Sequence, residues 1–489
     1  MIDILFVNQP RLHGIAVPRE IDCSNPQKDF VVQPLGLAYL VAAAREEGVK
    51  VALIDANVLD KNYDYIAHKI KQLKPKIVIG GFTAPTTYHD TFLAKVTKIN
   101  SKAYYGTWGP VASSAKEYLF KTFPDLDFII DNEPEETVKE LTKNLLEKKK
   151  NIFTNVKGLS YRLKKEIKFN GYRKLLINLD KLPIPAYDLL PMDKYYTPYA
   201  RRLPLTLMRT SRGCIAHCTF CITGGQKDAF CGYSKPWRAY SAQRTIKEIE
   251  HVSKKFGVKE INFFDPEFII NKQRVIDICK GIINKKLDVI WNCTARVDTI
   301  DMEVLKWMKK AGCFSISYGV ESVNPQVLKN IKKNITPSQV EAAVILTKAT
   351  GIQPALFFMM GLPGDTKKSC RENIKFAKYM ALKYDLRPQC TIATPYPGTV
   401  FYDYAQKNHL IRGDIKDFEQ TTPAISYPHL TQKDLSELHK EFYQEIVLNP
   451  KRLFKRVLRI RHPNEIKNIF IFVKNYAGNI IKKDMKFVR

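Results

Sequence analysis

The stretch Arg212-Gly213-Cys214-Ile215-Ala216-His217-Cys218-Thr219-Phe220-Cys221 places three cysteines at spacings of four and three residues. It follows a strand-like apolar run over residues 205–210, and the loops after the strands of an α/β domain are where ligands bind. Three thiolates from one loop can converge on one face of an iron–sulfur cluster, which prefers thiolate ligands. Because only three cysteines are close together, a [4Fe-4S] cluster held here would leave one iron free for another ligand.

Two other kinds of site would use the same cysteines. A zinc ion would take His217 or Cys231 as its fourth ligand, and an electron-transfer cluster would take a distant fourth cysteine. The remaining cysteines are single and widely spaced, which is typical of a protein kept in a reducing compartment. They are Cys23, Cys231, Cys279, Cys293, Cys313, Cys370 and Cys390.

Strand-like and helix-like segments alternate in six rounds from residue 203 onward. Strands are expected at 205–210, 260–264, 289–294, 314–319, 354–360 and 389–393. Helices are expected between them, for example at 242–256, 302–311 and 337–350, and Gly257, Gly312 and Gly351 each follow a helix as stop signals do. The pattern predicts a partial (β/α)6 barrel of the TIM type, with its working loops at the carboxyl ends of the strands.

The first part of the chain shows the same alternation. Strands are expected at 3–8, 49–55, 76–82, 102–106 and 126–131, and helices at 35–47, 63–73, 88–99 and 133–148. This predicts an α/β domain with a doubly wound, Rossmann-like parallel sheet, in which ligands lie beyond the carboxyl ends of the strands. Small residues there let a flat ligand approach the backbone, although ordinary turns would use the same residues. The cofactor-binding candidates at these ends are Gly81, Thr83, Gly106, Gly109 and Glu133.

Four regions follow from these patterns. We expect the N-terminal domain at residues 1–145, a connector with a hairpin at 146–202, the barrel at 203–430, and a basic helical region at 431–489. The N-terminus lacks a secretory signal and no apolar run is long enough to span a bilayer. These observations predict a cytoplasmic protein.

The C-terminal region places apolar residues at helical spacing among many cations, as in Lys451-Arg452-Leu453-Phe454-Lys455-Arg456. A basic amphipathic helix suits an anionic membrane surface, which would make the protein peripheral to a membrane. A helix docked on the barrel with a solvated basic face would show the same pattern. The formal net charge of +29 comes without a recognised nucleic-acid-binding module, so nucleic-acid binding is disfavoured.

Several motifs together resemble the radical S-adenosylmethionine (SAM) superfamily. They are the cysteine stretch, Trp237-Arg238, Phe264-Asp265-Pro266-Glu267-Phe268, Thr294-Ala295-Arg296-Val297-Asp298, Gly319-Val320-Glu321-Ser322 and Gly361-Leu362-Pro363-Gly364-Asp365-Thr366. Over about residues 1–430 the chain resembles the cobalamin-binding branch, which includes methyltransferases and anaerobic magnesium-protoporphyrin ester cyclases. The resemblance implies that Cys214, Cys218 and Cys221 bind a [4Fe-4S] cluster whose open iron chelates SAM.

The resemblance also implies roles for residues at the strand ends of the barrel. Glu321 and Arg296 are candidates for contacts with SAM or substrate, and Arg238 is a candidate for cofactor binding. Glu321 would alternatively cap the next helix, and Arg296 would pair with Asp298 or Asp265. Asp265 is a candidate for acid–base catalysis together with Glu267, where this branch is expected to carry an acidic pair.

Cobalamin is the cofactor that the resemblance implies for the N-terminal domain. The chain lacks the D-x-H-x-x-G sequence whose histidine ligates cobalt, so cobalamin would bind with its lower face unligated by histidine. The segment Gln33-Pro34-Leu35-Gly36-Leu37-Ala38-Tyr39-Leu40 resembles the start of the family's cobalamin-binding domain. Gly36 and Ala38 would also serve close packing against the sheet.

The expected reaction is reductive cleavage of SAM to methionine and a 5'-deoxyadenosyl radical, which takes a hydrogen atom from an unactivated carbon of a small-molecule or lipid substrate. Transfer of a methyl group from cobalamin would then give C-methylation, with the electron coming from a flavodoxin- or ferredoxin-type donor. A radical cyclisation, oxidation or C–C coupling on a lipid or tetrapyrrole is the alternative. A third possibility is a sensor protein that binds the cobalamin and the cluster without catalysing a reaction.

Overall fold

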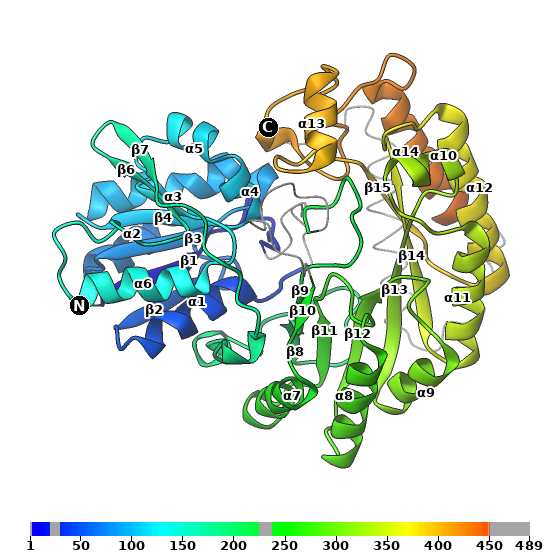
Figure 1. The fold of residues 1–489 in the computed structure, drawn as a ribbon, viewed down its shortest axis with the longest axis horizontal. Coiled ribbons are helices and arrows are strands. Elements are labelled where there is room, and N and C mark those ends of the chain that lie inside the picture. The colour runs from blue at the N-terminus through cyan, green and yellow to red at the C-terminus, as the bar shows by residue number, and fades with distance from the viewer. Residues whose placement is uncertain (1, 20–29, 224–236, 448, 450–489) are drawn as a thin grey trace.

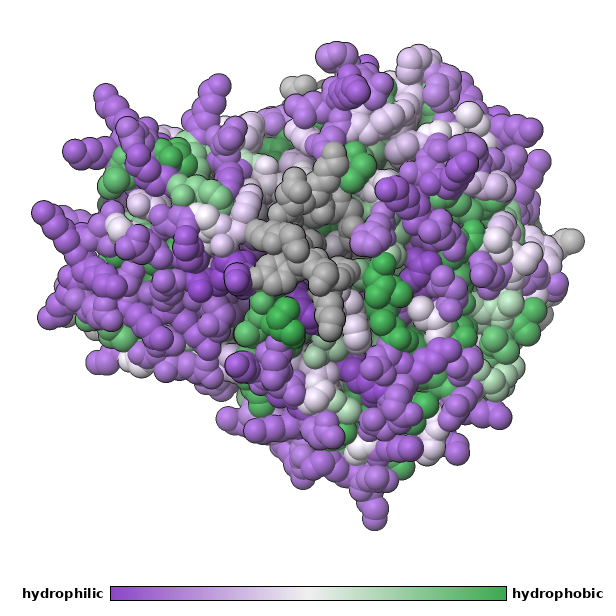
Figure 2. Space-filling model, in the orientation of Figure 1, coloured by the Kyte–Doolittle hydropathy of each residue, from purple (hydrophilic) through white to green (hydrophobic). Residues whose placement is uncertain are grey.

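The computed structural model describes residues 2–19, 30–223, 237–447 and 449. Two α/β units lie side by side, an N-terminal one coloured blue to cyan and a larger one coloured green to orange (Figure 1). Hydrophilic residues cover most of the face shown in Figure 2, over both units. No helix among the described residues is long and apolar enough to cross a membrane.

The N-terminal unit is built on a seven-stranded sheet with the order β2-β1-β3-β4-β5-β6-β7. Its first five strands run parallel: β1 (Ile4–Asn8), β2 (Val51–Asp55), β3 (Ile77–Gly81), β4 (Tyr104–Trp108) and β5 (Phe128–Ile130). The strand order reverses direction between β1 and β3, which defines the topological switch point of a doubly wound sheet. The predicted fold of this domain is therefore confirmed.

Helices cover both faces of this sheet and bury its central strands β1 and β3 along their whole length. One face packs on α1 (Leu35–Glu46) and α6 (Glu135–Leu146). The other packs on α2 (Tyr63–Leu73), α3 (Thr87–Asn100) and α5 (Lys116–Thr122), while the short α4 (Pro110–Ser114) follows β4.

The predicted hairpin is formed by β6 (Leu159–Leu163) and β7 (Glu166–Phe169). It adds to the N-terminal sheet, because β6 pairs antiparallel with β5. The sheet of the first unit thus extends to Phe169, beyond the boundary expected at residue 145. All four residues of β7 are exposed at the sheet edge.

The second unit is a six-stranded, all-parallel sheet curved into a partial barrel (Figure 1). All six predicted strands are present: β8 (Leu205–Met208), β11 (Glu260–Phe263), β12 (Ile290–Ala295), β13 (Cys313–Glu321), β14 (Gln353–Met360) and β15 (Gln389–Ile392). The outer layer consists of α7 (Ala242–Phe256), α8 (Lys272–Asn284), α9 (Met302–Lys310), α11 (Pro337–Ala349) and α12 (Lys367–Tyr384). The predicted barrel is confirmed.

Three further helices complete the barrel unit: α10 (Pro325–Asn330), α13 (Val400–Lys407) and α14 (Gln432–Val447). Leu435, Leu438, Phe442 and Ile446 of α14 are buried in the barrel core. The basic stretch from Lys451 onward lies outside the described residues, so its predicted membrane contact stays a prediction.

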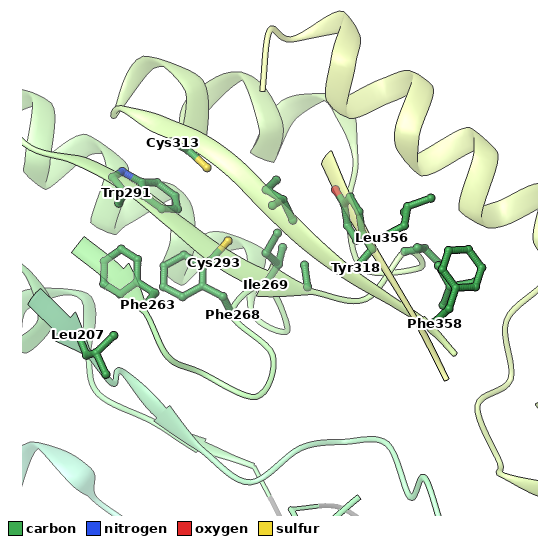
Figure 3. Packing of buried hydrophobic residues seen from close by; sticks show 14 of the residues in the cluster. Leu207, Phe263, Phe268, Ile269, Trp291, Cys293, Cys313, Tyr318, Leu356 and Phe358 are labelled. Carbon is green, nitrogen blue, oxygen red and sulfur yellow. The ribbon is translucent and has the colours of Figure 1, made fainter. Parts of the chain in front are cut away.

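The main core lies between the barrel strands and the outer helices. Phe263, Phe268 and Trp291 form an aromatic group (Figure 3). The Trp291 indole donates a hydrogen bond to the carbonyl of Ala311 at 2.8 Å. The alternate residues Asn262 and Asn292 are paired in register, only half-buried, and joined by a side-chain hydrogen bond. The two faces of the barrel strands are therefore chemically different, with the apolar face against the helices.

Candidate active site

The three cysteines lie on the loop that follows β9 (Ser211–Arg212), a short strand paired antiparallel with β10 (Arg238–Ala239). Cys218 is buried, while Cys214 and Cys221 are half-buried. The backbone N–H of Ala216 donates to Cys214 Sγ, and that of Thr223 donates to Cys221 Sγ, both at 3.4 Å. Such donors stabilise negative sulfur, as a thiolate ligand requires.

The same loop is fixed to the barrel through Thr219. Its N–H donates to the carbonyl of Ile331 at 3.1 Å, and its carbonyl accepts from the N–H of Phe401 at 2.9 Å. The cysteines are therefore held between the end of α10 and the start of α13. The predicted metal ligands occupy the mouth of the barrel.

Among residues 2–19, 30–223, 237–447 and 449, no three His, Cys, Asp or Glu side chains lie close enough together to hold a single metal ion. A [4Fe-4S] cluster binds its thiolates through separate iron atoms, so its cysteines do not converge on one point. His217 is exposed, and Cys231 lies outside the described residues.

Charges of both signs act on the buried thiol of Cys218, because Lys333 and Arg296 lower its pKa whereas Glu321 raises it. Burial raises the pKa of Cys218 to about 11, and the charges of Lys333 and Arg296 oppose that shift. Burial likewise raises the pKa of Cys214, against the hydrogen bond from Ala216 and the charge of Arg296. These cations would favour an anionic cluster at the loop.

Glu321 forms an ion pair with Lys333 rather than a helix cap. Its Oε1 accepts from Lys333 Nζ at 2.9 Å, and both residues are buried. Glu321 sits at an irregularity in the β13–β14 register with φ +63°, a conformation that non-glycine residues adopt rarely. The next helix, α10, is capped by Asn324 instead, so the capping alternative was wrong. The predicted contact of Glu321 with SAM or substrate stays a prediction.

Arg296 forms an ion pair with Asp298, which was the alternative to a contact with SAM or substrate. Its Nε and Nη2 donate to the two oxygens of Asp298 at 2.9 and 2.8 Å, and Nη2 also donates to the carbonyl of Lys333 at 3.1 Å. The pairing with Asp298 is confirmed, and the predicted catalytic role of Arg296 stays a prediction.

Asp265 holds the base of the cysteine loop. Its buried carboxylate accepts from the N–H of Thr210 at 2.9 Å, from the hydroxyl of Thr210 at 3.1 Å, and from the hydroxyl of Ser211 at 2.6 Å. Thr210 lies in the turn between β8 and β9, and Ser211 is the first residue of β9. The structure therefore gives Asp265 a positioning role, and the acid–base role expected from its strand-end location stays a prediction.

Of the two carboxylates Asp265 and Glu267, Glu267 is the one with an oxygen that accepts no hydrogen bond among the described residues. Its Oε1 accepts from the N–H of Ile269 at 3.0 Å and from the hydroxyl of Thr299 at 3.2 Å. Its Oε2 is buried without a hydrogen-bond partner among the described residues. Burial raises the pKa of Glu267 to about 7, and its charge acts on the thiol of Cys214. The sequence signal was the Asp-Pro-Glu motif, which did not distinguish the two carboxylates.

Three buried polar atoms lack hydrogen-bond partners at the carboxyl edge of the N-terminal sheet, within the part of the chain that the structure describes. They are Thr107 Oγ1, Trp108 Nε1 and Asn132 Nδ2. Thr107 and Trp108 end β4, and Asn132 follows β5 with φ +60°. Buried polar groups are normally paired, so this edge is where a polar ligand would bind.

The predicted cofactor-binding glycines have different surroundings. Gly106 faces the Phe128 ring, where an added Cβ would lie 2.1 Å from a ring carbon, so its smallness serves strand packing. Gly81 lies against the Trp108 indole, and Gly109, with φ +116°, directly precedes α4. The Thr83 hydroxyl bonds Thr86 within its own turn at 3.0 Å. Of these candidates, Gly81 is the one that lies beside the unpartnered Trp108 Nε1.

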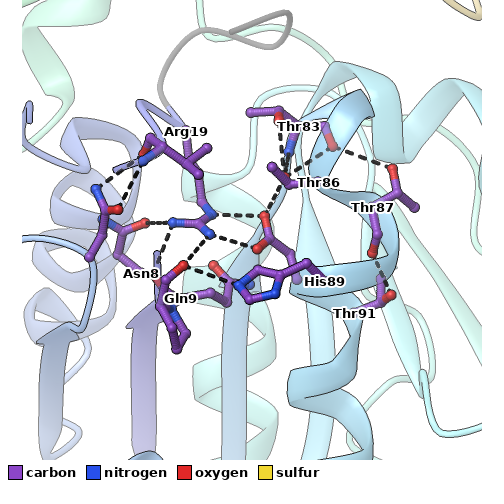
Figure 4. A network of polar contacts seen from close by, with 12 residues as sticks. Asn8, Gln9, Arg19, Thr83, Thr86, Thr87, His89 and Thr91 are labelled. Atoms are coloured by element: carbon purple, nitrogen blue, oxygen red, sulfur yellow. Dashed lines mark hydrogen bonds and ion pairs between the residues drawn. The ribbon is translucent and has the colours of Figure 1, made fainter. Parts of the chain in front are cut away.

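The switch point between β1 and β3 is filled by a polar network (Figure 4). Arg19 donates to both oxygens of Asp90 at 2.7 Å and to the carbonyls of Gln9 and Pro10 at 2.9 and 2.7 Å. His89 contacts the Pro10 carbonyl through Nε2 at 3.2 Å. No sequence signal pointed to this network, because Arg19 lies in an irregular segment. The three buried polar atoms that lack hydrogen-bond partners among the described residues lie along the same edge of the sheet, at the end of β4 and just after β5.

Glu133 and Arg238, both predicted to bind a cofactor, contact each other. Arg238 Nη1 donates to Glu133 Oε2 at 3.0 Å, and a second, shorter contact joins Nη2 to Oε1. Arg212 and Glu135 form a similar pair beside them. The predicted cofactor-binding groups are thus engaged in a contact between the two units.

The barrel matches a model of the radical SAM superfamily over residues 208–377. The chain is also 37% identical over 428 residues to an uncharacterized methyltransferase of Pyrococcus horikoshii, covering 87% of this chain and 90% of that protein. The chain belongs to the radical SAM superfamily. Membership in this family implies a [4Fe-4S] cluster and SAM, in place of the zinc and electron-transfer alternatives.

Further proteins are similar to this radical SAM protein at lower identity. It is 25% identical over 441 residues to the anaerobic magnesium-protoporphyrin IX monomethyl ester cyclase of Cereibacter sphaeroides, covering 85% of this chain and 68% of that protein. The cobalamin-dependent SAM radical enzyme OxsB, solved with aqua-cobalamin and SAM, shares the fold with a TM-score of 0.71 at 21% identity, over 98% of this chain and 71% of that one. The methyltransferase TsrM of Kitasatospora setae gives a TM-score of 0.64 at 16% identity, over 84% and 75%.

Proposed function

We propose that this radical SAM protein is a cobalamin-dependent enzyme that methylates an unactivated carbon atom. The observation that carries the proposal is the contact between the cysteine loop and the carboxyl edge of the N-terminal sheet. Arg212, two residues before Cys214, pairs with Glu135, three residues after Asn132. The cysteine loop therefore lies next to the carboxyl edge of the N-terminal sheet, where the three buried polar atoms lack hydrogen-bond partners among the described residues. Two cofactors that react together need to lie close to each other.

The residues on each side fit the cofactors that the family and the neighbouring structures indicate. Cys214, Cys218 and Cys221 would hold the cluster, and Thr107, Trp108 and Asn132 would hydrogen-bond the amide groups at the rim of cobalamin. When bound, the cluster would supply an electron to cleave SAM and cobalamin would supply the methyl group.

Glu267 would bind the α-ammonium group of SAM through its unused Oε2. The residue follows β11 at the mouth of the barrel, and its charge acts on the thiol of Cys214. A buried carboxylate oxygen without a partner is costly, and an ammonium ligand would remove that cost. The cations Lys333 and Arg296 would in turn attract the carboxylate of SAM.

Anaerobic reconstitution with iron and sulfide, followed by optical spectra with and without hydroxocobalamin, tests the cofactor pair. We expect retention of both, and Trp108→Phe should weaken cobalamin retention without changing the iron content. Trp307→Phe is the matched control, because Trp307 lies on α9 of the barrel and contacts the ammonium groups of Lys280 and Lys310. A native protein that holds the cluster but no cobalamin would contradict the N-terminal assignment.

Product analysis tests the reaction itself. Methyl transfer consumes extra SAM, so we expect S-adenosylhomocysteine alongside 5'-deoxyadenosine. The similarity to a magnesium-protoporphyrin ester cyclase favours cyclisation as the second candidate, which would give 5'-deoxyadenosine alone. A flavodoxin- or ferredoxin-type protein is the electron donor we propose for both assays.

A further inference from the structure

The ribbon of β9 and β10 carries the base of the cysteine loop. Arg212 and Arg238 are directly opposite each other in its register. Arg212 lies two residues before Cys214, so a movement of the ribbon would move the first cysteine. Whatever holds these two arginines therefore also positions the loop.

Two glutamates of the N-terminal unit hold both arginines. Arg212 Nη1 lies 3.0 Å from Glu135 Oε2, with a second, shorter contact from Nη2 to Oε1, and Arg212 Nη1 also lies 3.4 Å from Glu133 Oε2. Arg238 contacts Glu133 in the same two-pronged way and donates to the carbonyl of Leu176 at 2.9 Å. We call Glu133, Glu135, Arg212 and Arg238 the ribbon clasp.

The ribbon clasp is balanced in charge and largely shielded from solvent. Arg238 and Glu135 are each only 4% exposed, whereas Glu133 and Arg212 are partly buried. Burial by itself would raise the pKa of Glu133, but the guanidinium groups of Arg212 and Arg238 hold that pKa below its ordinary value. Each carboxylate also lies near the N-terminus of α6, where negative charge is favoured. Loss of Glu133 would leave the buried Arg238 without a carboxylate partner, and loss of Glu135 would leave Arg212 with only its longer contact to Glu133.

The first residue of the ribbon clasp, Glu133, directly follows Asn132 at the carboxyl edge of the N-terminal sheet. The Nδ2 of Asn132 has no hydrogen-bond partner among the described residues. The ribbon clasp thus joins Asn132 of one unit to the cysteine loop of the other through a few covalent bonds and three ion pairs.

We propose that Glu133 and Glu135 are positioning residues that fix the cysteine loop relative to the carboxyl edge of the N-terminal sheet. For the ligand of that edge the inference rests on the proposed function, whereas the position of the loop does not depend on it. The ribbon clasp would set the separation between the cluster and a cofactor bound at Asn132.

Hydrogen exchange of the full-length protein tests the position of the loop without any cofactor. In Glu133→Gln and Glu135→Gln, we expect amides of residues 205–223 to exchange about tenfold faster or more, because an arginine of the ribbon clasp loses one of its counter-charges in each variant. Glu136→Gln is the matched control, since Glu136 follows directly in α6 and pairs with Lys139 at 3.2 Å instead. The conservative Glu135→Asp keeps the charge and should restore part of the protection.

Reconstituted protein gives the second readout. The two variants should lose iron to a chelator faster than the native protein and the Glu136→Gln control, and the electron paramagnetic resonance signal of the reduced cluster should change. With cobalamin in its Co(II) form, the dipolar broadening between the two centres should weaken. Native exchange, native iron loss and an unchanged cluster signal in both variants would overturn the inference, while absence of cobalamin binding would contradict only the proposed function.

Discussion

Lys333 places its Nζ 2.9 Å from Oε1 of Glu321, and both side chains are buried. The charge of Lys333 also acts on the thiol of Cys218. The pair therefore neutralises a buried carboxylate, and both of its charges act on the Cys218 thiol, whose pKa Lys333 lowers and Glu321 raises. Its partners come from β13 and from the turn after α10, so it also ties that turn to the barrel.

Replacement of Lys333 by methionine should destabilise the protein strongly. Lys333→Met leaves Glu321 buried without a counter-charge, which costs about 3 to 5 kcal/mol. Urea unfolding of the apoprotein measures the change, and the double variant Lys333→Met/Glu321→Gln should recover part of it. Equal unfolding free energies for the native protein and Lys333→Met would show that the pair is not coupled.

Alanine at Cys214, Cys218 or Cys221 should abolish the cluster. Each substitution removes one of the three thiolates, so we expect loss of the iron–sulfur absorption and of SAM cleavage after reconstitution. His217→Ala, in the same loop, should keep both and serves as the control. A cysteine variant with native iron content would argue against its role as a ligand.

Glu267 should make stability depend on pH. Its pKa is about 7 in the folded protein, against 4.5 as the ordinary value, because of burial. Between these values the folded protein keeps a proton that the unfolded chain has released, so the unfolding free energy falls as pH rises. The loss amounts to about 3 kcal/mol and is complete above the folded pKa.

Urea unfolding of the native protein and Glu267→Gln, at a pH of about 5 and of about 8, measures this difference. The native protein should lose stability relative to the variant at the higher pH. Glu303→Gln, which changes an exposed carboxylate of α9, is the control. A pH-independent difference between native and Glu267→Gln would contradict the burial effect.

Asp265→Asn should separate positioning from catalysis. The asparagine cannot accept all three hydrogen bonds from Thr210 and Ser211, so the base of the cysteine loop should loosen and less cluster should be retained. Cleavage of SAM per bound cluster should stay near the native level. Full cluster content without any cleavage would instead assign Asp265 the catalytic role.

Gly36→Ala should be costly because of one aromatic ring. An added Cβ would lie 2.0 Å from a carbon of Trp108, so overpacking should lower the unfolding free energy by about 1 to 3 kcal/mol. In Gly36→Ala/Trp108→Leu the smaller side chain should relieve that cost. Strictly additive effects of the two substitutions would show that the ring and the glycine do not meet.

The order of the elements and the location of the cysteines could be predicted from the residues alone. The helix predicted at 242–256 has the predicted bounds, because Ser241 caps its N-terminus and Gly257, with φ +65°, ends it. These signals are local, as are three cysteines within eight residues. Local signals survive folding because neighbours in the chain stay neighbours in space.

Which charged groups meet could be learned only from the folded chain. Glu133 and Arg238 are 105 residues apart, and Asp265 reaches Thr210 across 55 residues. In the sequence Glu133 was predicted to bind a cofactor and Asp265 to act in acid–base catalysis, since a strand-end charge has the same pattern whether its partner is a ligand or the protein. The same holds for Gly106, whose missing side chain makes room for Phe128. The sequence pattern predicts that a group will be buried. Which group it pairs with depends on how the strands and the two units are placed against each other.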